Sequence, residues 1–449
     1  MTGGRPDSRT IAYAAGLVLV FALALFVRER VWTACGGGAA SYLDWAQQHY
    51  YGGISRVYVR SAEDLARGHP YTTVAYPPGY PAFLALLIRS GLTLQHVRIV
   101  QFVVDALAVF ATAALLRSIG VMRIWALAGA LAYALHPLWA TGSVYLLAEA
   151  FSPAIVVAFL WSLVESLDRS PRAAIAPGLV AGVGALFRPD FLLLVVPGLV
   201  WFLVVDRRPG RLRAAAWFAS TVCVFVLLWG VHNKRTHGIW MFGTTASGAG
   251  LWEGLGELPN DYGYVLDDAY ADRFLRSHGL AWATLEANTF FTREFVRAVR
   301  EHPGHVARVI VHRWRRIVVE SEPLRADVFA RLRSFVDTLG VVVLAAAIAL
   351  ARRRRDVLFV AAMPLVFAML SIGLVHYEAR YVRYAQLSYL VGGIVLLDAL
   401  WSSLTDRVAP RPRTAIAVML AAVAFAHVGR QLVELDRLAR IPESPIAGS

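Results

Sequence analysis

The segment Ile11–Val27 reads IAYAAGLVLVFALALFV and is followed at once by Arg28, Glu29 and Arg30. It contains no charged residue, and its length approaches the roughly 20 apolar residues with which a helix crosses a hydrocarbon core. Similar apolar blocks, bounded by arginines or prolines, recur along the chain of 449 residues, of which 57% are hydrophobic and 17% charged. Soluble domains carry about 25% charged residues. The sequence therefore predicts an all-α integral membrane protein.

We predict about eleven transmembrane helices, because about that many apolar blocks are long enough to cross a bilayer. Their approximate ranges are 11–27, 97–116, 124–140, 150–166, 173–187, 190–205, 214–231, 335–351, 357–375, 386–401 and 414–428. The apolar segment Gly79–Leu92 is shorter, and we expect it to lie along the outer membrane interface.

The arginines fix the expected orientation. If the N-terminus is cytoplasmic, every short inner loop carries at least two arginines, as the positive-inside rule expects. These arginines are Arg5, Arg9, Arg117, Arg123, Arg169, Arg172, Arg207, Arg208, Arg211, Arg213, Arg352 to Arg355, Arg407, Arg411 and Arg413. We therefore expect a multi-pass protein of the inner or plasma membrane.

This orientation divides the chain into three parts. Residues 1–231 form an N-terminal transmembrane part with a first outer loop, 28–96. Residues 232–334 form a large extracytoplasmic loop, and 335–449 form a C-terminal transmembrane part with a short outer tail. Within the large loop, apolar residues recur at near-helical spacing among arginines from Phe291 to Val319. Such a helix either rests in the interface among lipid phosphates or packs on the membrane domain.

Several classes of protein are disfavoured. The net charge of +13 comes mostly from arginines between apolar blocks rather than from a basic tail, which argues against nucleic acid as a partner. The two cysteines, Cys35 and Cys223, have no metal or redox spacing. We find neither a phosphate-binding glycine loop nor a dinucleotide fingerprint, and the histidines have no zinc-site spacing. We therefore predict no metal-ligating residue and no certain cofactor.

The first outer loop contains the most informative residues. Tyr42-Leu43-Asp44-Trp45-Ala46 follows the first span, and Tyr76-Pro77-Pro78-Gly79-Tyr80-Pro81 ends the loop. Consecutive prolines favour extended backbone, so they predict a rigid corner. Aromatic rings with polar edges suit both lipid headgroups and sugar faces. This corner is therefore either an interfacial anchoring belt or part of a sugar site.

The order of these residues resembles the first outer loop of the GT-C superfamily. This superfamily includes protein mannosyltransferases, the lipid A aminoarabinose transferase and bacterial relatives grouped under glycosyltransferase family 39. Three later stretches resemble the same family, in the same order. They are His136-Pro137 with Ala148-Glu149; Trp229 to Asn233 with Gly238, Thr244-Thr245 and Gly250-Leu251-Trp252-Glu253-Gly254; and His376-Tyr377-Glu378-Ala379-Arg380-Tyr381.

The resemblance covers most of the chain from the first span to about residue 400. It implies a membrane glycosyltransferase that moves a sugar from a polyprenyl-phosphate donor to a lipid, glycan or protein acceptor. The reaction in this superfamily is usually a single inverting displacement at the outer membrane face, and a divalent metal ion assists in some relatives. Neither the sugar nor the acceptor can be identified from the sequence.

Sugar transfer needs a base for the acceptor hydroxyl, and a carboxylate is suitable. The resemblance points to Asp44, an acidic residue soon after the first span, and secondly to Glu149. Many relatives have an aspartate four residues before a tyrosine of this loop, but the positions here are Gly38 and Ile54. Asp44 is therefore either a displaced base or a helix cap. Glu149 either faces a cavity or pairs with an arginine.

The departing phosphate needs guanidinium groups, which bind phosphate oxygens bidentately. Our candidates are Arg380, Arg188 and Arg383, with His376 and Tyr377 nearby. The alternative role of Arg380 is a surface ion pair with Glu378. The alternative for Arg188 is local neutralisation by Asp190. From the resemblance we expect the substrate loops to contribute Tyr58, Tyr76, Pro77, Pro78 and Trp252.

Two other functions compete with the transferase. A transporter or lipid flippase needs charged residues in its spans, and Asp105 is the clear mid-span acid. A non-catalytic relative of the transferases is consistent with the missing aspartate at Gly38 or Ile54.

Overall fold

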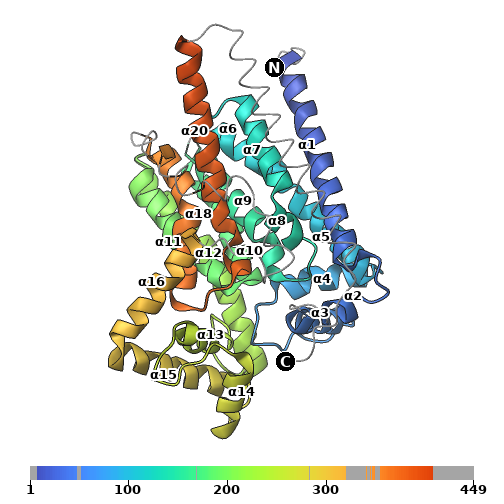
Figure 1. The fold of residues 1–449 in the computed structure, drawn as a ribbon, viewed down its shortest axis with the longest axis vertical. Coiled ribbons are helices and arrows are strands. Elements are labelled where there is room, and N and C mark those ends of the chain that lie inside the picture. Colours follow the sequence, from blue (N-terminus) through green and yellow to red (C-terminus); the bar gives the residue numbers. More distant parts are fainter. Residues whose placement is uncertain are drawn as a thin grey trace.

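The computed structural model describes residues 8–47, 52–167, 169–282, 284–319 and 354–407. It also describes residues 340, 344 and 346–348. Within these residues the protein is helical and has no β-strand (Figure 1). The predicted span 335–351 lies mostly outside the described residues, and the predicted span 414–428 lies wholly outside them.

In the part of the chain that the structure describes, six helical segments are long and apolar enough to cross a membrane. They are α1 (Ser8–Trp32), α5 (Leu94–Ala106) with α6 (Ala108–Ser118), η2 (Ala148–Phe151) with α9 (Ser152–Glu165), α12 (Arg211–His237), α18 (Arg355–Leu374), and α19 (Ala379–Val382) with η7 (Arg383–Ala385) and α20 (Gln386–Arg407). Each coincides with a span predicted from the sequence, so the multi-span helical fold is confirmed.

Shorter apolar helices account for the other predicted spans in the described part of the chain. They are α7 (Arg123–Leu135), η3 (Pro171–Ala174) with α10 (Ile175–Phe187), and η4 (Pro189–Leu194) with α11 (Val195–Val200) and η5 (Trp201–Val205). α4 (Gly79–Arg89) is the short apolar segment expected at the interface. α10 ends at Phe187, directly before Arg188, because Pro189 cannot continue its hydrogen-bond ladder.

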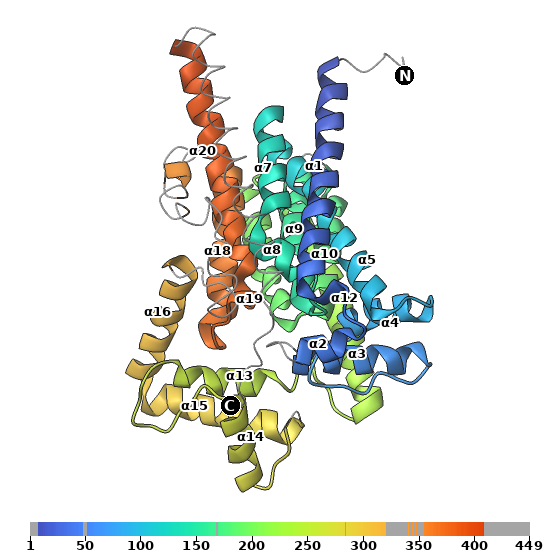
Figure 2. The ribbon, with the colours of Figure 1, turned by 45° about the vertical axis from the view of Figure 1, so that its right-hand side comes forward.

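The first loop and the large loop lie together at the end of the bundle opposite the N-terminus, here called the loop end (Figures 1 and 2). The first loop contains η1 (Thr33–Gly37), α2 (Tyr42–Gln47) and α3 (Gly52–Ala66). The large loop contains α13 (Ser247–Glu253), η6 (Gly254–Glu257), α14 (Asp268–Ser277), α15 (Leu285–Glu301) and α16 (Pro303–Val319). A backbone hydrogen bond of 3.0 Å from Thr245 to Val74 ties the two loops together.

The amphipathic run predicted over 291–319 forms two helices rather than one. α15 ends at Glu301 and α16 begins at Pro303, a residue suited to a first helical position. α16 packs on α18, where the Trp314 indole donates to the Met369 carbonyl at 3.0 Å. Val311 of the same helix is 60% exposed. The large loop is thus attached directly to the membrane bundle.

A buried cluster joins α1, α5 and α7. Arg28 Nε donates to Asp105 at 2.8 Å, Arg28 Nη2 lies 2.7 Å from the same carboxylate, and the Tyr133 hydroxyl donates to it at 3.0 Å. All three side chains are fully buried. Asp105, the mid-span acid that suggested a transporter, is therefore neutralised by a structural partner.

The first loop is fastened by a second arginine, Arg98 on α5. Its guanidinium donates to the carbonyls of Cys35 at 2.6 Å and Val144 at 2.7 Å. Gly36 has φ 73°, a left-handed conformation that favours glycine, and a Cβ at this position would lie 2.5 Å from the Trp45 ring. These contacts fix the chain as it leaves α1 and turns into the first loop.

Candidate active site

Glu149 occupies the centre of a buried charge cluster at the loop end. It lies in η2, directly before α9, and its side chain is 8% exposed. One carboxylate oxygen, Oε1, lies 3.9 Å from Arg188 Nη1 and 3.8 Å from Arg380 Nε. The other, Oε2, has no hydrogen-bond partner among the described residues. Glu149 is therefore held by charge rather than by short hydrogen bonds.

Arg188 enters the cluster from the turn between α10 and η4. Its backbone is extended, and its amide donates to Gly184 at 2.8 Å. Nε and Nη2 donate to the two oxygens of Asp190 at 2.9 and 3.1 Å, while Nη1 faces Glu149. The ion pair with Asp190 is therefore formed, and it leaves another edge of the guanidinium toward the cluster.

Arg380 enters from the segment between α18 and α20. Its guanidinium pairs with Glu378, whose other oxygen lies 3.1 Å from His376 Nε2. Burial would raise the pKa of Glu378, but Arg380 and His376 outweigh it and lower this pKa to about 2. The Tyr381 ring lies between two guanidiniums, 5.0 Å from that of Arg188 and 4.8 Å from that of Arg380. Glu378 and Tyr381 thus join the cluster although neither was a predicted site residue.

The tyrosines of the first loop border this cluster. Tyr58 and Tyr76 are largely buried, with ring centroids 5.2 Å apart. Burial raises the pKa of both hydroxyls. The Glu149 carboxylate raises these two pKa values further, whereas the Arg380 guanidinium lowers them. Glu149 and Arg380 are therefore close enough to act on both tyrosines. A belt of lipid-facing anchors does not account for rings buried against charged groups.

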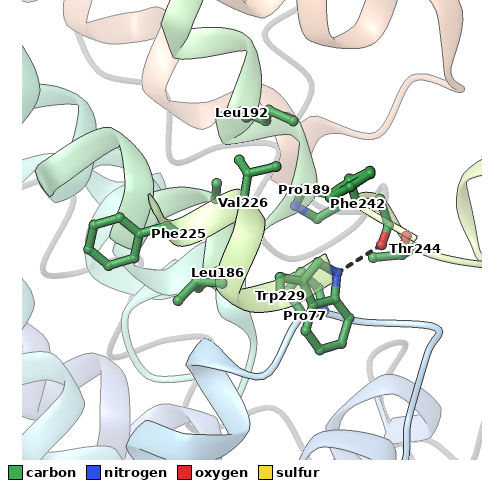
Figure 3. A pocket seen from close by; sticks show the side chains of 11 residues that line it. Pro77, Leu186, Pro189, Leu192, Phe225, Val226, Trp229, Phe242 and Thr244 are labelled. Atoms are coloured by element: carbon green, nitrogen blue, oxygen red, sulfur yellow. Dashed lines mark hydrogen bonds between the residues drawn. The ribbon is translucent and has the colours of Figure 1, made fainter. Parts of the chain in front are cut away.

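The prolines of the same corner have separate positions. Pro77 lines an apolar groove beside the turn that carries Arg188 (Figure 3). Pro78 is the residue before α4. The groove is lined by Pro77, Ala185, Leu186, Pro189, Leu192, Phe225, Val226, Trp229, Phe242, Gly243 and Thr244. Beside the groove the Trp229 indole donates to the Gly243 carbonyl at 3.0 Å (Figure 3).

The large loop brings a second group of carboxylates to this region. Glu253, at the end of α13, is 2% exposed. Burial, the neighbouring Asp268 and Asp267, and Glu378 raise its pKa to about 8. Its neighbour Trp252 is buried and stacks on Phe274 at 5.0 Å between ring centroids. Trp252 therefore stabilises the core of the large loop, rather than presenting an open face to a substrate.

Asp44 does not share the cluster. Its side chain is 76% exposed, and the nearest cation is Arg56 at 3.8 Å. It lies in the first turn of α2, where a carboxylate favours the helix dipole, and its backbone amide donates to Ser41 Oγ at 3.3 Å. Ser41 thus caps this turn, and the Asp44 carboxylate is largely exposed to solvent.

Arg383 and Tyr377 contact other parts of the protein. Arg383 packs over Gly142, where a Cβ would come 1.9 Å from its Nη1. Its carbonyl accepts from the Trp139 indole at 2.9 Å. The Tyr377 ring lies 4.1 Å beneath the guanidinium of Arg316.

Across the described residues, no group of three or more His, Cys, Asp or Glu side chains is arranged to hold a metal ion. The Glu253 and Asp268 carboxyls are neighbours, but together they provide only two ligands. We therefore assign no residue to a metal.

The fold and the buried cluster define a multi-span helical membrane protein with a charged site at one end of the bundle. The family model of dolichyl-phosphate-mannose-protein mannosyltransferases matches residues 75–231. This range includes Tyr76, Glu149 and Arg188, but neither Asp44 nor Arg380.

A search of solved structures finds an oligosaccharyltransferase of Archaeoglobus fulgidus, determined with a tethered acceptor peptide that contains the NVT sequon. The TM-score is 0.56 at 12% identity, and the match covers 97% of this chain but 56% of that one. This chain thus spans little more than half the length of that protein, and the likeness concerns the fold. No curated protein matches in sequence. The family match and this structure confirm the resemblance to the GT-C glycosyltransferases.

Proposed function

We propose that this protein transfers a sugar from a polyprenyl-phosphate carrier to an acceptor at the loop end of the bundle, which the arginine pattern places outside the cell. The observation that carries the proposal is the position of Glu149 between Arg188 and Arg380, with one oxygen lacking a hydrogen-bond partner among the described residues. Buried charges are costly unless paired, so a loosely paired cluster favours a ligand that completes it.

The charge balance indicates how the donor binds. Two guanidiniums, Arg188 and Arg380, face the carboxylates of Glu149, Asp190 and Glu378. The donor phosphodiester carries one negative charge, so its binding requires one carboxylate to leave the arginines. Asp190 is bonded at 2.9 and 3.1 Å, whereas Glu149 lies at 3.8 to 3.9 Å. We infer that the phosphate displaces Glu149.

The displaced Glu149 then serves as the base. The acceptor oxygen attacks the anomeric carbon, and the bond between that carbon and the phosphate oxygen breaks. Polyprenyl phosphate leaves with the bonding electrons, stabilised by Arg380 and Arg188, and the acceptor proton passes to Glu149. Attack opposite the leaving phosphate inverts the anomeric configuration.

The apolar groove suits the lipid part of the donor. It begins at Leu186 and Pro189, which flank Arg188 in sequence, and continues along α12 through Val226 and Phe225 (Figure 3). An isoprenoid chain whose phosphate lies on Arg188 would bury its first units here. Such a donor would enter from the bilayer along α12.

Transfer by the purified protein in lipid vesicles tests the proposal. Radiolabelled polyprenyl-phosphate sugars would be offered with lipid, glycan and peptide acceptors, and nucleotide sugars would serve as the control donors. The proposal expects transfer from at least one polyprenyl-phosphate sugar and none from nucleotide sugars. If the protein binds donors but transfers sugar from none of them, a non-catalytic relative is favoured. If it moves a donor across the bilayer without transferring the sugar, a flippase is favoured.

A further inference from the structure

The segment before Arg380 has no regular secondary structure. α18 ends at Leu374, Val375 and Glu378 have extended backbone, and α19 begins at Ala379. Backbone amides and carbonyls of such a segment need partners from elsewhere in the protein when they are buried. The position of Arg380 therefore depends on whatever holds this turn.

Two residues of the large loop hold the turn. Glu257 Oε1 accepts a hydrogen bond of 2.6 Å from the Tyr377 amide. Arg313 Nη1 donates a hydrogen bond of 2.8 Å to the Gly373 carbonyl. Glu257 and Arg313 are 3.1 Å apart, and both side chains are 1% exposed. One buried ion pair thus fastens both sides of the turn to η6 and α16.

The fit around this pair is close. A Cβ at Gly254 would lie 2.3 Å from Arg313 Nη2 and 2.8 Å from the Val375 carbonyl oxygen. Only glycine at this position lets η6 approach the turn and the guanidinium at once. The contact therefore involves the backbone of both segments as well as the two charged side chains.

We propose that Glu257 and Arg313 are positioning residues for the donor phosphate, because they orient the turn from which Arg380 and Glu378 project. This inference rests on the proposed function. A buried ion pair is weak evidence for stability, since apolar residues of similar size are often as good. Its hydrogen bonds to an irregular turn beside the cluster indicate a role in orientation, and it makes Arg380 dependent on the large loop.

The test compares Glu257→Gln and Gly254→Ala with the wild type. The first removes charge and the second disturbs only shape. Binding of farnesyl phosphate to the purified protein is the probe, and hydrogen exchange of the peptide containing Tyr377 reports the order of the turn. We expect affinity to fall on the order of tenfold in each variant, because small displacements of a binding group have large effects, and exchange of the Tyr377 amide to accelerate.

Two variants in the same loop serve as controls. Gly304→Ala adds a methyl group where nothing lies within 4 Å, on the helix that carries Arg313. Asp272→Asn breaks an exposed pair of 2.8 Å with Arg276. Both controls should bind farnesyl phosphate as the wild type does.

Repeating the binding measurement in an Arg380→Gln background shows whether Glu257→Gln acts through the position of Arg380 or damages the protein generally. If Glu257 acts through Arg380, Glu257→Gln should weaken binding little further there. The same fold-loss in both backgrounds would overturn the proposal, as would an unchanged affinity combined with accelerated exchange. A wild type that does not bind farnesyl phosphate would instead contradict the proposed function. If Glu257→Gln fails to fold, Gly254→Ala carries the comparison.

Discussion

Among the residues that the structure describes, the cluster around Asp105 and the cluster around Glu149 differ in how they are closed. In the closed cluster, Arg28, Asp105 and Tyr133 meet at 2.7 to 3.0 Å. In the open cluster, Glu149 lies 3.8 to 3.9 Å from Arg188 and Arg380. A buried carboxylate without a close partner is expensive, so the loose pairing of Glu149 is the feature that a bound ligand would explain.

The two clusters also differ in the elements that they connect. The closed cluster joins three helices and leaves no function to assign to Asp105. The open cluster draws on η2, the turn after α10 and the segment after α18, and the tyrosines of the first loop border it. We expect substitutions in the first to affect folding and substitutions in the second to affect transfer.

The largest effect is expected from Glu149→Gln. Loss of the base should reduce the transfer rate by roughly 10²- to 10⁴-fold. Affinity for the donor should be unchanged or higher, because the neutral amide no longer competes with the phosphate for Arg188 and Arg380. Parallel measurement of transfer and donor binding checks this, with Asp190→Asn as a control that keeps the base. Equal loss of binding and transfer would mean that Glu149 merely supports the arginines.

In the closed cluster, Asp105→Asn should cost about 3–5 kcal/mol of stability, because it leaves Arg28 buried without a counter-charge. Thermal unfolding of the detergent-solubilised protein measures this. Arg169→Gln, which breaks an exposed pair with Glu165, should change stability by less than about 1 kcal/mol. A wild-type melting temperature for Asp105→Asn would remove the distinction between the two clusters.

Arg380→Lys keeps the charge of the open cluster but loses the planar fork. We expect donor affinity to fall about tenfold, since a bidentate phosphate contact becomes a point contact. Arg276→Lys, at an exposed position in the large loop, is the matched control. Equal affinity of Arg380→Lys and the wild type would exclude a bidentate contact.

The sequence was informative where the signal is local. Apolar blocks predicted the helices of the bundle, and the resemblance pointed to Glu149, Arg188 and Arg380, which the structure brings together. The breaks were harder to locate: the amphipathic run over 291–319 divides at Pro303, although its periodicity continues past that residue. Periodicity alone does not show where one helix ends and the next begins.

Pairings across long sequence separations could not be predicted. Arg28 and Asp105 lie 77 positions apart, and Glu257 and Arg313 lie 56 positions apart. Only the packing of helices brings such residues together. Asp44 shows the converse, because its place after the first span matched the resemblance, yet the turn into α2 leaves its carboxylate in the open.

A smaller effect tests the carboxylates contributed by the large loop. The pKa of Glu253, about 8, lies above the ordinary value of about 4.3. Its protonated form thus contributes stability that is fully present below about pH 4.3 and is lost as pH rises through about 8. Between about pH 5 and pH 9, the apparent melting temperature of Glu253→Gln should therefore fall less than that of the wild type. Parallel behaviour of variant and wild type would contradict the burial of this carboxyl; Glu286→Gln, at an exposed position, is the control.

The smallest effect is expected from Asp44→Asn. Because this side chain is 76% exposed and lies outside the open cluster, transfer should stay within about twofold of the wild type. A loss comparable with that of Glu149→Gln would instead assign the base to Asp44 and require the first loop to move toward the donor.

The most direct test of the central claim is the affinity of farnesyl phosphate for the wild type, Arg380→Gln and Glu149→Gln. Our account predicts that Arg380→Gln binds at least tenfold more weakly, since the charged partner of the phosphate is lost. It predicts that Glu149→Gln binds as tightly as the wild type or more tightly. Weakening of both variants to the same extent, or equal binding by all three proteins, would contradict the claim that the open cluster is the phosphate site.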